Sequence, residues 1–381
     1  MKTVPHAGDQ APHLHTWEKK MRVGLQMVFQ NYMKRVPDSQ VFQEEAENAV
    51  LADELGFDEL WPVEHHFADY AFCPDNMQFL SYVAPQTKQI QLGTGAVILP
   101  WNDPYRVVEK MIMLDIMCNG RALFGMGRGL SKDEYGPMGI PMDEARERFD
   151  EAAEIILRGL ETGKLSADGK FWKRAATDAR PAPIKSFKGR ALSVAMSPDS
   201  ALQAAKLGVG VMMFTQKPVE ALLPDLDRYR DAFKEHQGHA SPPPRFADFV
   251  FCAEDADEAE EKGFENIAAY YSQVMQHYDL MGEHFAKMKG YESYGQAAEM
   301  LKDIGLEDQV RSYVDQQAYG TPDQIIAKLE HRRKVLGPFS LNCCFRFSNL
   351  DKQDVQSSMR LFAEKVLPVV REWEADTASA A

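Results

Sequence analysis

The sequence has few cysteines, no excess of positive charge and no long apolar run, and each shortage excludes a class of protein. Its five cysteines, Cys73, Cys118, Cys252, Cys343 and Cys344, show no CxxC spacing, so we predict reduced thiols, a cytoplasmic location and no zinc framework. The formal net charge of −14 argues against general binding to nucleic acid or anionic membrane, because both require a basic surface. No run of about 18 apolar residues occurs, so we predict no membrane span.

The first 20 residues differ from the rest of the chain. Residues 1–17 are polar and have no apolar segment before a small-residue cleavage site, so they do not match a secretory signal. We predict an N-terminal extension over residues 1–20, either a loose lead or a packing arm. Residues 21–375 contain no linker rich in Gly, Pro or Ser, and we expect them to form a single domain.

Short apolar segments alternate with amphipathic helices along this domain. The predicted strands are 21–28, 57–63, 90–99, 121–126, 190–196, 209–215, 247–252 and 339–346. Because their apolar residues do not alternate cleanly with polar ones, they are typical of parallel strands buried on both faces. Eight such strand–helix units favour an α/β fold of the (β/α)8 TIM-barrel type over an open doubly wound sheet.

Several helix boundaries are marked by capping residues. Residues 142–160 carry one apolar stripe and predict an amphipathic helix. Ser197 and Thr321 each precede Pro-Asp, which places a hydroxyl at the N-cap and a proline at the first helical position. We expect these two helices to end near Gly208 and Gly337, where a left-handed residue is needed.

The stretch 254–320, between the seventh and eighth strands, is longer than a barrel helix requires. We predict that it is the chief insertion of the barrel. It is rich in aromatic and histidine side chains: Tyr270, Tyr271, His277, Tyr278, Phe285 and Tyr294. Excess chain on the catalytic side of a barrel often forms a lid. The alternative is a set of extra helices packed on the outside, and the sequence leaves both open.

The second predicted strand ends in Glu64-His65-His66. α/β enzymes place their chemistry at such strand ends, and histidine changes its charge near neutral pH. We therefore predict catalytic roles for His65 and Glu64. A metal site is the alternative. Neighbouring strand residues point to opposite faces, so the two histidines do not easily reach one ion, and we predict no metal.

Two further strand ends predict an anion site. Arg128 follows the fourth strand and is flanked by glycines, and Ser197 begins a helix directly after the fifth. Bare amides, a guanidinium and a helix N-terminus all favour a phosphate, and adjacent strand ends would bring them together. The alternatives are an ordinary helix cap at Ser197 and an ion pair of Arg128 with Asp133 or Glu134.

The third predicted strand contains Gly93 and Gly95 in an otherwise apolar run. Glycine weakens strand pairing, so it usually marks a bulge or a surface that something flat approaches closely. We expect one of these two explanations at this strand.

Together these features resemble the bacterial luciferase-like, flavin-dependent monooxygenases from about residue 21 to residue 368. The resemblance lies in Glu64-His-His-Phe67, Gly93-Thr-Gly-Ala-Val-Ile-Leu-Pro100, Leu114-Asp115, Gly120-Arg121 and Phe124-Gly-Met-Gly-Arg-Gly129. The tail pieces Gly320-Thr-Pro322 and Asn342-Cys-Cys344 are similar to the luciferase α chain. The family has a (β/α)8 barrel, binds reduced FMN at its C-terminal mouth and forms a flavin C4a-hydroperoxide with O2. A separate NAD(P)H:flavin reductase usually supplies the reduced flavin.

The resemblance implies roles for particular residues. His65 is similar to the histidine with which the family manages protons around the flavin. The implied FMN-binding residues are Arg128 with the amides around Met196, Ser197 and Ser200, and Gly95-Ala96, where the family has a non-prolyl cis peptide. For the substrate pocket we predict an apolar lining of Met27, Phe67, Trp101 and Phe214, with Met126 assigned to the core.

The sequence departs from luciferase beside the flavin. Gly127 replaces a cysteine and Ser131 a tyrosine, so light emission is not implied. We predict an FMN-dependent monooxygenase of an apolar organic substrate such as an aldehyde, ketone or terpenoid. The alternatives are a deazaflavin (F420)-dependent oxidoreductase and a non-catalytic partner subunit. The resemblance also implies a homodimer through the helices beside strands two and three.

Overall fold

The computed structural model describes residues 21–302 and 304–373. The predicted N-terminal extension, residues 1–20, lies outside the described residues. The barrel strands are β1 (Val23–Met27), β2 (Glu59–Pro62), β3 (Gln91–Gly93), β4 (Val97–Ile98), β5 (Ala122–Gly127), β8 (Ala191–Val194), β9 (Gly210–Phe214), β10 (Arg245–Phe249) and β11 (Ser340–Cys344). Each predicted strand segment contains or overlaps a strand of the structure.

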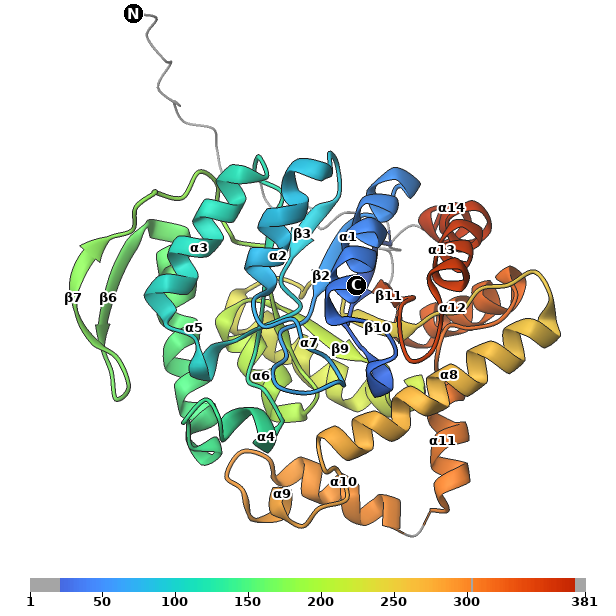
Figure 1. Cartoon of the computed structure of the whole chain (residues 1–381). Helices are drawn as coiled ribbons and strands as arrows, with labels where there is room; N and C mark the ends of the chain where they lie inside the picture. Colours follow the sequence, from blue (N-terminus) through green and yellow to red (C-terminus); the bar gives the residue numbers. More distant parts are fainter. Residues whose placement is uncertain (1–20, 303, 374–381) are drawn as a thin grey trace, which may run out of the picture.

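The strands form one closed, parallel sheet (Figure 1). β1 pairs with β11 on one side and β2 on the other, and the sheet closes where β3 and β4 both pair with β5. β3 and β4 are therefore two halves of one interrupted strand, which gives the predicted eight-stranded barrel. The interruption contains the cis peptide bond between Gly95 and Ala96, as the resemblance implied.

Trp61 explains the glycines of the third strand. Its side chain is fully buried inside the barrel with Leu123, Leu192 and Met212. A methyl group on Gly93 would lie 2.5 Å from the indole ring, and one on Gly95 would lie 3.0 Å from the Trp61 Cβ. The flat group that approaches this strand is therefore a side chain of the protein itself.

The helices that cover the barrel are α1 (Asp38–Leu55), α2 (Asn76–Val83), α3 (Pro104–Met117), α5 (Ala145–Thr162), α6 (Pro198–Leu207), α7 (Leu223–Gln237), α12 (Pro322–Leu336), α13 (Lys352–Leu361) and α14 (Leu367–Arg371). Short 3-10 segments are η1 (Tyr32–Lys34), η2 (Ala84–Gln86), η3 (Leu99–Trp101), η4 (Met142–Glu144) and η5 (Val219–Leu222), and a π segment, η6 (Phe362–Val366), joins α13 to α14. The two predicted caps are present, because Ser197 accepts from the Ser200 amide and Thr321 forms a capping box with Gln324. Gly208 and Gly337 follow these helices with φ of 70° and 77°.

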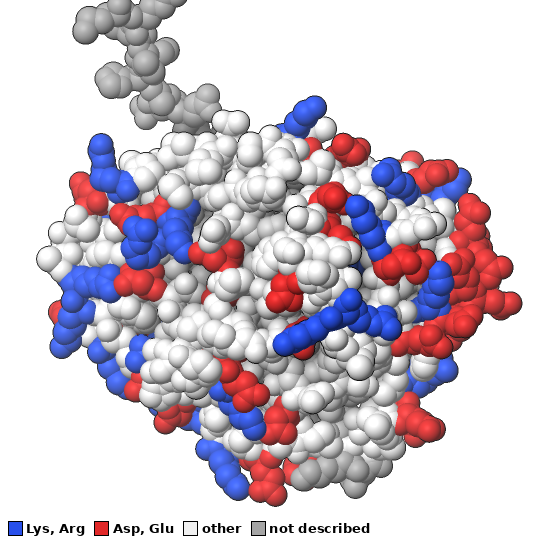
Figure 2. All heavy atoms as spheres, in the orientation of Figure 1, with Lys and Arg blue, Asp and Glu red and all other residues white. Residues whose placement is uncertain are grey.

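The insertion consists of α8 (Ala256–His277), α9 (His284–Lys287), α10 (Glu292–Lys302) and α11 (Leu306–Asp315). In Figure 1 α9 and α10 lie below the barrel, on the same side as α4 (Lys132–Tyr135), while α8 and α11 lie toward the lower right. Ion pairs and hydrogen bonds join the insertion to the segment after β5, including Lys132 to Asp279 at 2.7 Å. Figure 2 shows acidic side chains gathered at the edge where α8 begins, a helix whose first turns are rich in Asp and Glu. The insertion is thus a cover on the strand ends rather than an outer layer.

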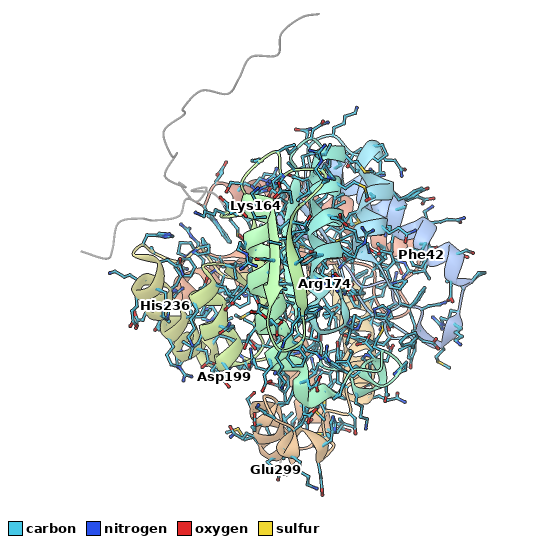
Figure 3. The ribbon with its side chains drawn as sticks, turned by 90° about the vertical axis from the view of Figure 1, so that its left-hand side faces the viewer. Phe42, Lys164, Arg174, Asp199, His236 and Glu299 are labelled. Carbon is cyan, nitrogen blue, oxygen red and sulfur yellow. The ribbon has the colours of Figure 1, made fainter. Side chains whose placement is uncertain are left out.

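An antiparallel hairpin was not predicted from the sequence. It consists of β6 (Lys164–Asp168) and β7 (Lys173–Asp178), and it carries Lys164 and Arg174 on the side of the molecule that faces the viewer in Figure 3. All residues of β7 are exposed. Within the described residues, no helix is long and apolar enough to cross a membrane.

Candidate functional site

A cavity of about 330 Å³ lies at the carboxyl ends of the barrel strands. Its barrel wall comes from the ends of β1, β2, β4, β5, β8 and β9, and its other wall comes from the insertion. The barrel side includes Val28, Val63, His65, Gly95, Ala96, Ile98, Arg128, Val194, Met196, Ser200 and Phe214. The insertion side includes Tyr270, Tyr271, Val274, Tyr278, Leu280, Tyr294 and Tyr313. The predicted anion site and the predicted histidine therefore border one cavity, which is lined mainly by apolar and aromatic side chains.

The cationic side of the site consists of Arg128 and the start of α6, which border the cavity, and of Arg146, which contacts Ser200 from α5. Ser200 lines the cavity, and Arg146 Nη2 donates to its Oγ at 3.4 Å. Ser197 Oγ lies 2.9 Å from Ser200 Oγ and accepts from the Ser200 amide at 3.3 Å. Two guanidinium groups therefore converge with the N-terminus of α6, a helix of ten residues. Such an arrangement favours an anion.

Arg128 does not form the ion pair with Asp133 or Glu134 that was the alternative from the sequence. Its guanidinium instead donates to the Gly290 carbonyl of the insertion and lies 3.9 Å from the centre of the Tyr291 ring. Tyr291 in turn donates to the Gly129 carbonyl at 2.8 Å. The insertion thus holds Arg128 in place at the edge of the cavity.

His65 also borders the cavity, where it lies in a polar network. Its Nδ1 is 2.9 Å from Oε1 of Glu134, and its Nε2 is 3.3 Å from the hydroxyl of Tyr278. Glu134 comes from α4 and Tyr278 follows α8, so a strand end, a short helix and the insertion together fix the imidazole. Histidine held by a carboxylate in this way is suited to proton transfer.

Glu64 faces the cavity, but its carboxylate is already engaged. It accepts from the Ile98 amide at 3.0 Å, from Trp101 Nε1 at 2.7 Å and from Asn102 Nδ2 at 2.9 Å. These donors lie in β4, the second half of the interrupted third strand, and in the segment that follows it. The buried carboxylate of Glu64 has its acceptor positions filled and holds this segment in place beside the cis peptide bond. The geometry therefore gives Glu64 a structural role.

The structure places the residues of the predicted substrate lining in different surroundings. Phe214 lines the cavity. Met27 does not, because its side chain belongs to the core between β1 and the outer helices, and the next residue, Val28, faces the cavity instead. Phe67 is 67% exposed and points away from the cavity, and Trp101 packs on Tyr135 while its indole binds Glu64. Met126 is fully buried core, as assigned.

Sequence reasoning missed three polar residues of the site. Arg146 lies inside the regular helix α5, where a charged residue looks like part of a solvated face. Glu134 was considered only as a partner of Arg128. Tyr70, whose hydroxyl is 2.6 Å from that of Tyr270, lies in a loop without a recognisable motif. No motif or spacing in the sequence marks any of the three.

The chain is a closed (β/α)8 barrel with an apolar cavity at its strand ends. The cationic clamp and the carboxylate-bound histidine beside this cavity are typical of barrel proteins that bind an anionic organic ligand at the catalytic face. The chain belongs to the luciferase-like monooxygenase family, whose model matches residues 21–337. Among relatives, the alkanal monooxygenase alpha chain of Photobacterium leiognathi is 24% identical over 327 residues, 85% of this chain and 92% of that protein.

Solved structures share the fold. The monooxygenase RslO1 from Streptomyces bottropensis matches with a TM-score of 0.77 and 27% identity, covering 92% of this chain and 99% of that one. The oxygenating constituent of 3,6-diketocamphane monooxygenase from Pseudomonas putida, in complex with FMN, matches with a TM-score of 0.72 and 19% identity, covering 92% and 98%. A coenzyme F420-dependent tetrahydromethanopterin reductase from Methanopyrus kandleri also matches, with a TM-score of 0.64, 19% identity and coverage of 93% and 99%.

Proposed function

We propose that this protein is a monooxygenase that uses reduced FMN and O2 to oxidise an apolar organic substrate, and that a separate NAD(P)H:flavin reductase supplies the reduced flavin. The observation that carries the proposal is the one cavity that Arg128, Ser200 and His65 all border. Membership of the luciferase-like monooxygenase family supports the reaction class.

The described residues fit FMN. Arg128, Arg146 and Ser200 would hold its phosphate, since guanidinium groups and helix N-termini are the usual partners of phosphate. Burial and the neighbouring Arg128 lower the pKa of Arg146, and a bound phosphate would relieve the repulsion between the two cations. The apolar barrel wall would accept the flavin ring system beside the bond between Gly95 and Ala96.

Reduced FMN, when bound, supplies the two electrons that allow one oxygen atom of O2 to enter the substrate while the other leaves as water. The protein's own contribution is to bind, to exclude water and to hold a proton. The largely apolar cavity limits access of bulk water to the reaction. His65, held by Glu134 on its Nδ1 side, presents its Nε2 to the cavity as the group that gives or takes a proton.

The lining also indicates the substrate class. Side chains such as Val28, Val63, Phe214, Val274 and Leu280 form an apolar surface, and that surface favours a compact apolar carbonyl compound or terpenoid over a charged metabolite. The hydroxyl of Tyr278, 3.3 Å from His65 Nε2, would orient a carbonyl oxygen.

The test is oxygen uptake by the purified chain, supplied with photoreduced FMN, against a panel of aldehydes, ketones and terpenes. We expect product to form in step with O2 consumption for at least one apolar compound. The same panel is run without oxygen and with reduced F420, because F420-dependent enzymes share the fold. Turnover with F420 in the absence of O2, or failure to bind either carrier, would refute the proposal in favour of a reductase or a non-catalytic subunit.

A further inference from the structure

Glu134 is the buried partner of His65. Its side chain is 2% exposed, and Oε1 lies 2.9 Å from His65 Nδ1 and accepts from the His66 amide at 2.8 Å. Burial acts to raise the pKa of Glu134, but the charge and hydrogen bond of His65 and the His66 amide outweigh it and hold that pKa below its ordinary value. The carboxylate is therefore ionised next to the imidazole at neutral pH.

A second histidine from the insertion faces the same pair. His277, at the end of α8, stacks on Tyr70 with ring centres 4.4 Å apart and an interplanar angle of 16°, and its ring centre is 5.7 Å from that of His65. Its Nε2 is buried and has no hydrogen-bond partner in the described structure. Burial, followed by the charge of His65, lowers the pKa of His277 to about 4. His277 is therefore uncharged at neutral pH.

The titratable groups that face His65 come from every element packed against it. Glu134 comes from α4, His277 and Tyr278 come from the insertion, and His66 and Tyr70 come from the segment after β2. Of these, Glu134 is the one that contacts Nδ1, and Tyr278 is the one whose hydroxyl contacts Nε2.

We propose that Glu134 is a positioning residue for the proton on His65, and that a neutral His277 leaves this pair undisturbed. Glu134 accepts the Nδ1 proton and so fixes the imidazole in one tautomer, which leaves Nε2 as the ring nitrogen that exchanges a proton with the cavity. His277 remains uncharged against Tyr70, so the single positive charge that the carboxylate stabilises resides on His65. The proposal rests on the proposed function only where it states that this proton is used in turnover.

The tautomer is read directly from ¹⁵N chemical shifts of the histidine ring nitrogens in labelled full-length protein, without flavin. We expect neutral His65 to carry its proton on Nδ1 in the parent. The variant Glu134→Gln retains an acceptor but lacks the charge, and the variant Glu134→Met lacks both. Glu134→Gln should keep the tautomer, whereas Glu134→Met should give a mixture. The parent's tautomer unchanged in a folded Glu134→Met variant would overturn the proposal.

Turnover supplies the second readout, as the ratio of product formed to O2 consumed over a range of pH. With Glu134→Gln the acid limb of this profile should move to lower pH, because the carboxylate no longer stabilises the imidazolium. With Glu134→Met the coupled fraction should fall by about tenfold, less than the roughly 100-fold or more that acid–base catalysis contributes, because His65 itself remains. FMN affinity should change little, because Glu134 contacts His65 and the His66 amide rather than the anion clamp. Glu151→Gln, which removes a carboxylate that binds the Phe171 and Trp172 amides, is the matched control, and an equal effect there would count against the proposal.

His277 and a metal alternative are tested together. His277→Phe should preserve the stack on Tyr70 and leave the His65 tautomer unchanged. His277→Lys places a cation beside His65, so the acid limb of the pH profile should lie at lower pH than in the parent. The ligand atoms of His65, Glu134 and His277 lie within 4.8 Å of one another. A loss of coupled turnover on dialysis against EDTA that is restored by Zn²⁺ would mean that they bind an ion, and would overturn the proposal. If the parent does not consume O2 with reduced FMN, the proposed function fails, while the tautomer experiment still decides the inference.

Discussion

Arg146 lies beside Arg128, and burial together with this second guanidinium lowers the pKa of Arg146. Both approach the turn at Gly290, where an added methyl group would be 2.9 Å from Arg128 Nη1 and 3.5 Å from the Arg146 Cβ. Two like charges held together at the edge of a cavity indicate a site arranged for an anion. The relationship makes Arg146 as important to test as Arg128.

We predict that Arg128→Ala and Arg146→Ala each weaken FMN binding by about 1.5–3 kcal/mol, or roughly 10- to 150-fold in Kd, the usual range for a hydrogen bond to a charged group. Quenching of flavin fluorescence during titration measures the Kd. Arg148→Ala is the control, because Arg148 lies in the same helix and pairs with Glu144 instead. Superimposable titration curves for all three variants and the parent would show that Arg128 and Arg146 do not bind the FMN phosphate.

Gly93 is predicted to tolerate no side chain. Gly93→Ala would place a methyl group 2.5 Å from the ring of Trp61, which is fully buried and cannot move away. We expect a loss of about 1–3 kcal/mol in the free energy of unfolding, the usual cost of overpacking a core. Gly136→Ala, whose nearest atom would be at 3.4 Å, should change stability much less. Equal urea midpoints for the two variants would contradict the packing argument.

Glu45 of α1 predicts a pH dependence of stability. Burial raises its pKa to about 7, from 4.5, although Arg346 acts to lower it. Because the folded pKa is raised, the stabilising protonated form is fully present below pH 4.5 and is lost as pH rises toward 7. Glu45→Gln should therefore gain stability over the parent across this window, reaching about 3 kcal/mol above pH 7. Urea unfolding at pH 5 and pH 8 measures the difference.

The neighbouring Glu47 provides the control for that experiment. It lies in the same helix but is exposed and pairs with Lys352, so Glu47→Gln should leave the pH dependence unchanged. If Glu45→Gln tracks the parent at both pH values, the carboxyl of Glu45 is not protonated in the folded protein at pH 5.

The predicted homodimer can be tested on α2 and α3. Tyr82, Met113 and Met117 are 64%, 47% and 49% exposed, and the two helices pack together, with Lys110 bound to Asp75 at 2.6 Å. We expect Met113→Glu combined with Met117→Glu to shift a dimer to monomer in analytical ultracentrifugation, because charges would enter an apolar contact. Met300→Glu, on the insertion, should not. A parent that sediments as a monomer would end the homodimer prediction.

The barrel was predictable because its strands are marked by local composition. The apolar runs, the capping residues and the strand ends with Glu64, His65 and Arg128 are all readable along the chain. The β6–β7 hairpin was missed because its residues are polar and β7 is exposed throughout, so no apolar pattern marks it. The interruption of the third strand is a consequence of packing against Trp61, which only the closed barrel reveals.

The site was predictable in its position and less so in its side chains. Strand ends meet at one face, so His65 and Arg128 could be placed on one cavity. The other polar residues of the site come from helices: Arg146, Glu134 and His277. On a helix, a shift of one residue decides whether a side chain faces solvent or the site. The same limit explains Met27, because strand residues alternate in direction and Val28, one position later, is the residue that faces inward.

The cavity has two walls of different origin, and this separates its tasks. The barrel contributes the anion clamp and the imidazole, while helices α8 to α11 contribute most of the aromatic surface across from them. Exchange of those helices for another set would alter what the pocket admits, as long as the new set keeps the contacts that Gly290, Tyr291 and Tyr278 make with the strand ends. Evolution, or a protein engineer, can therefore retarget such a barrel by replacing one contiguous stretch of chain.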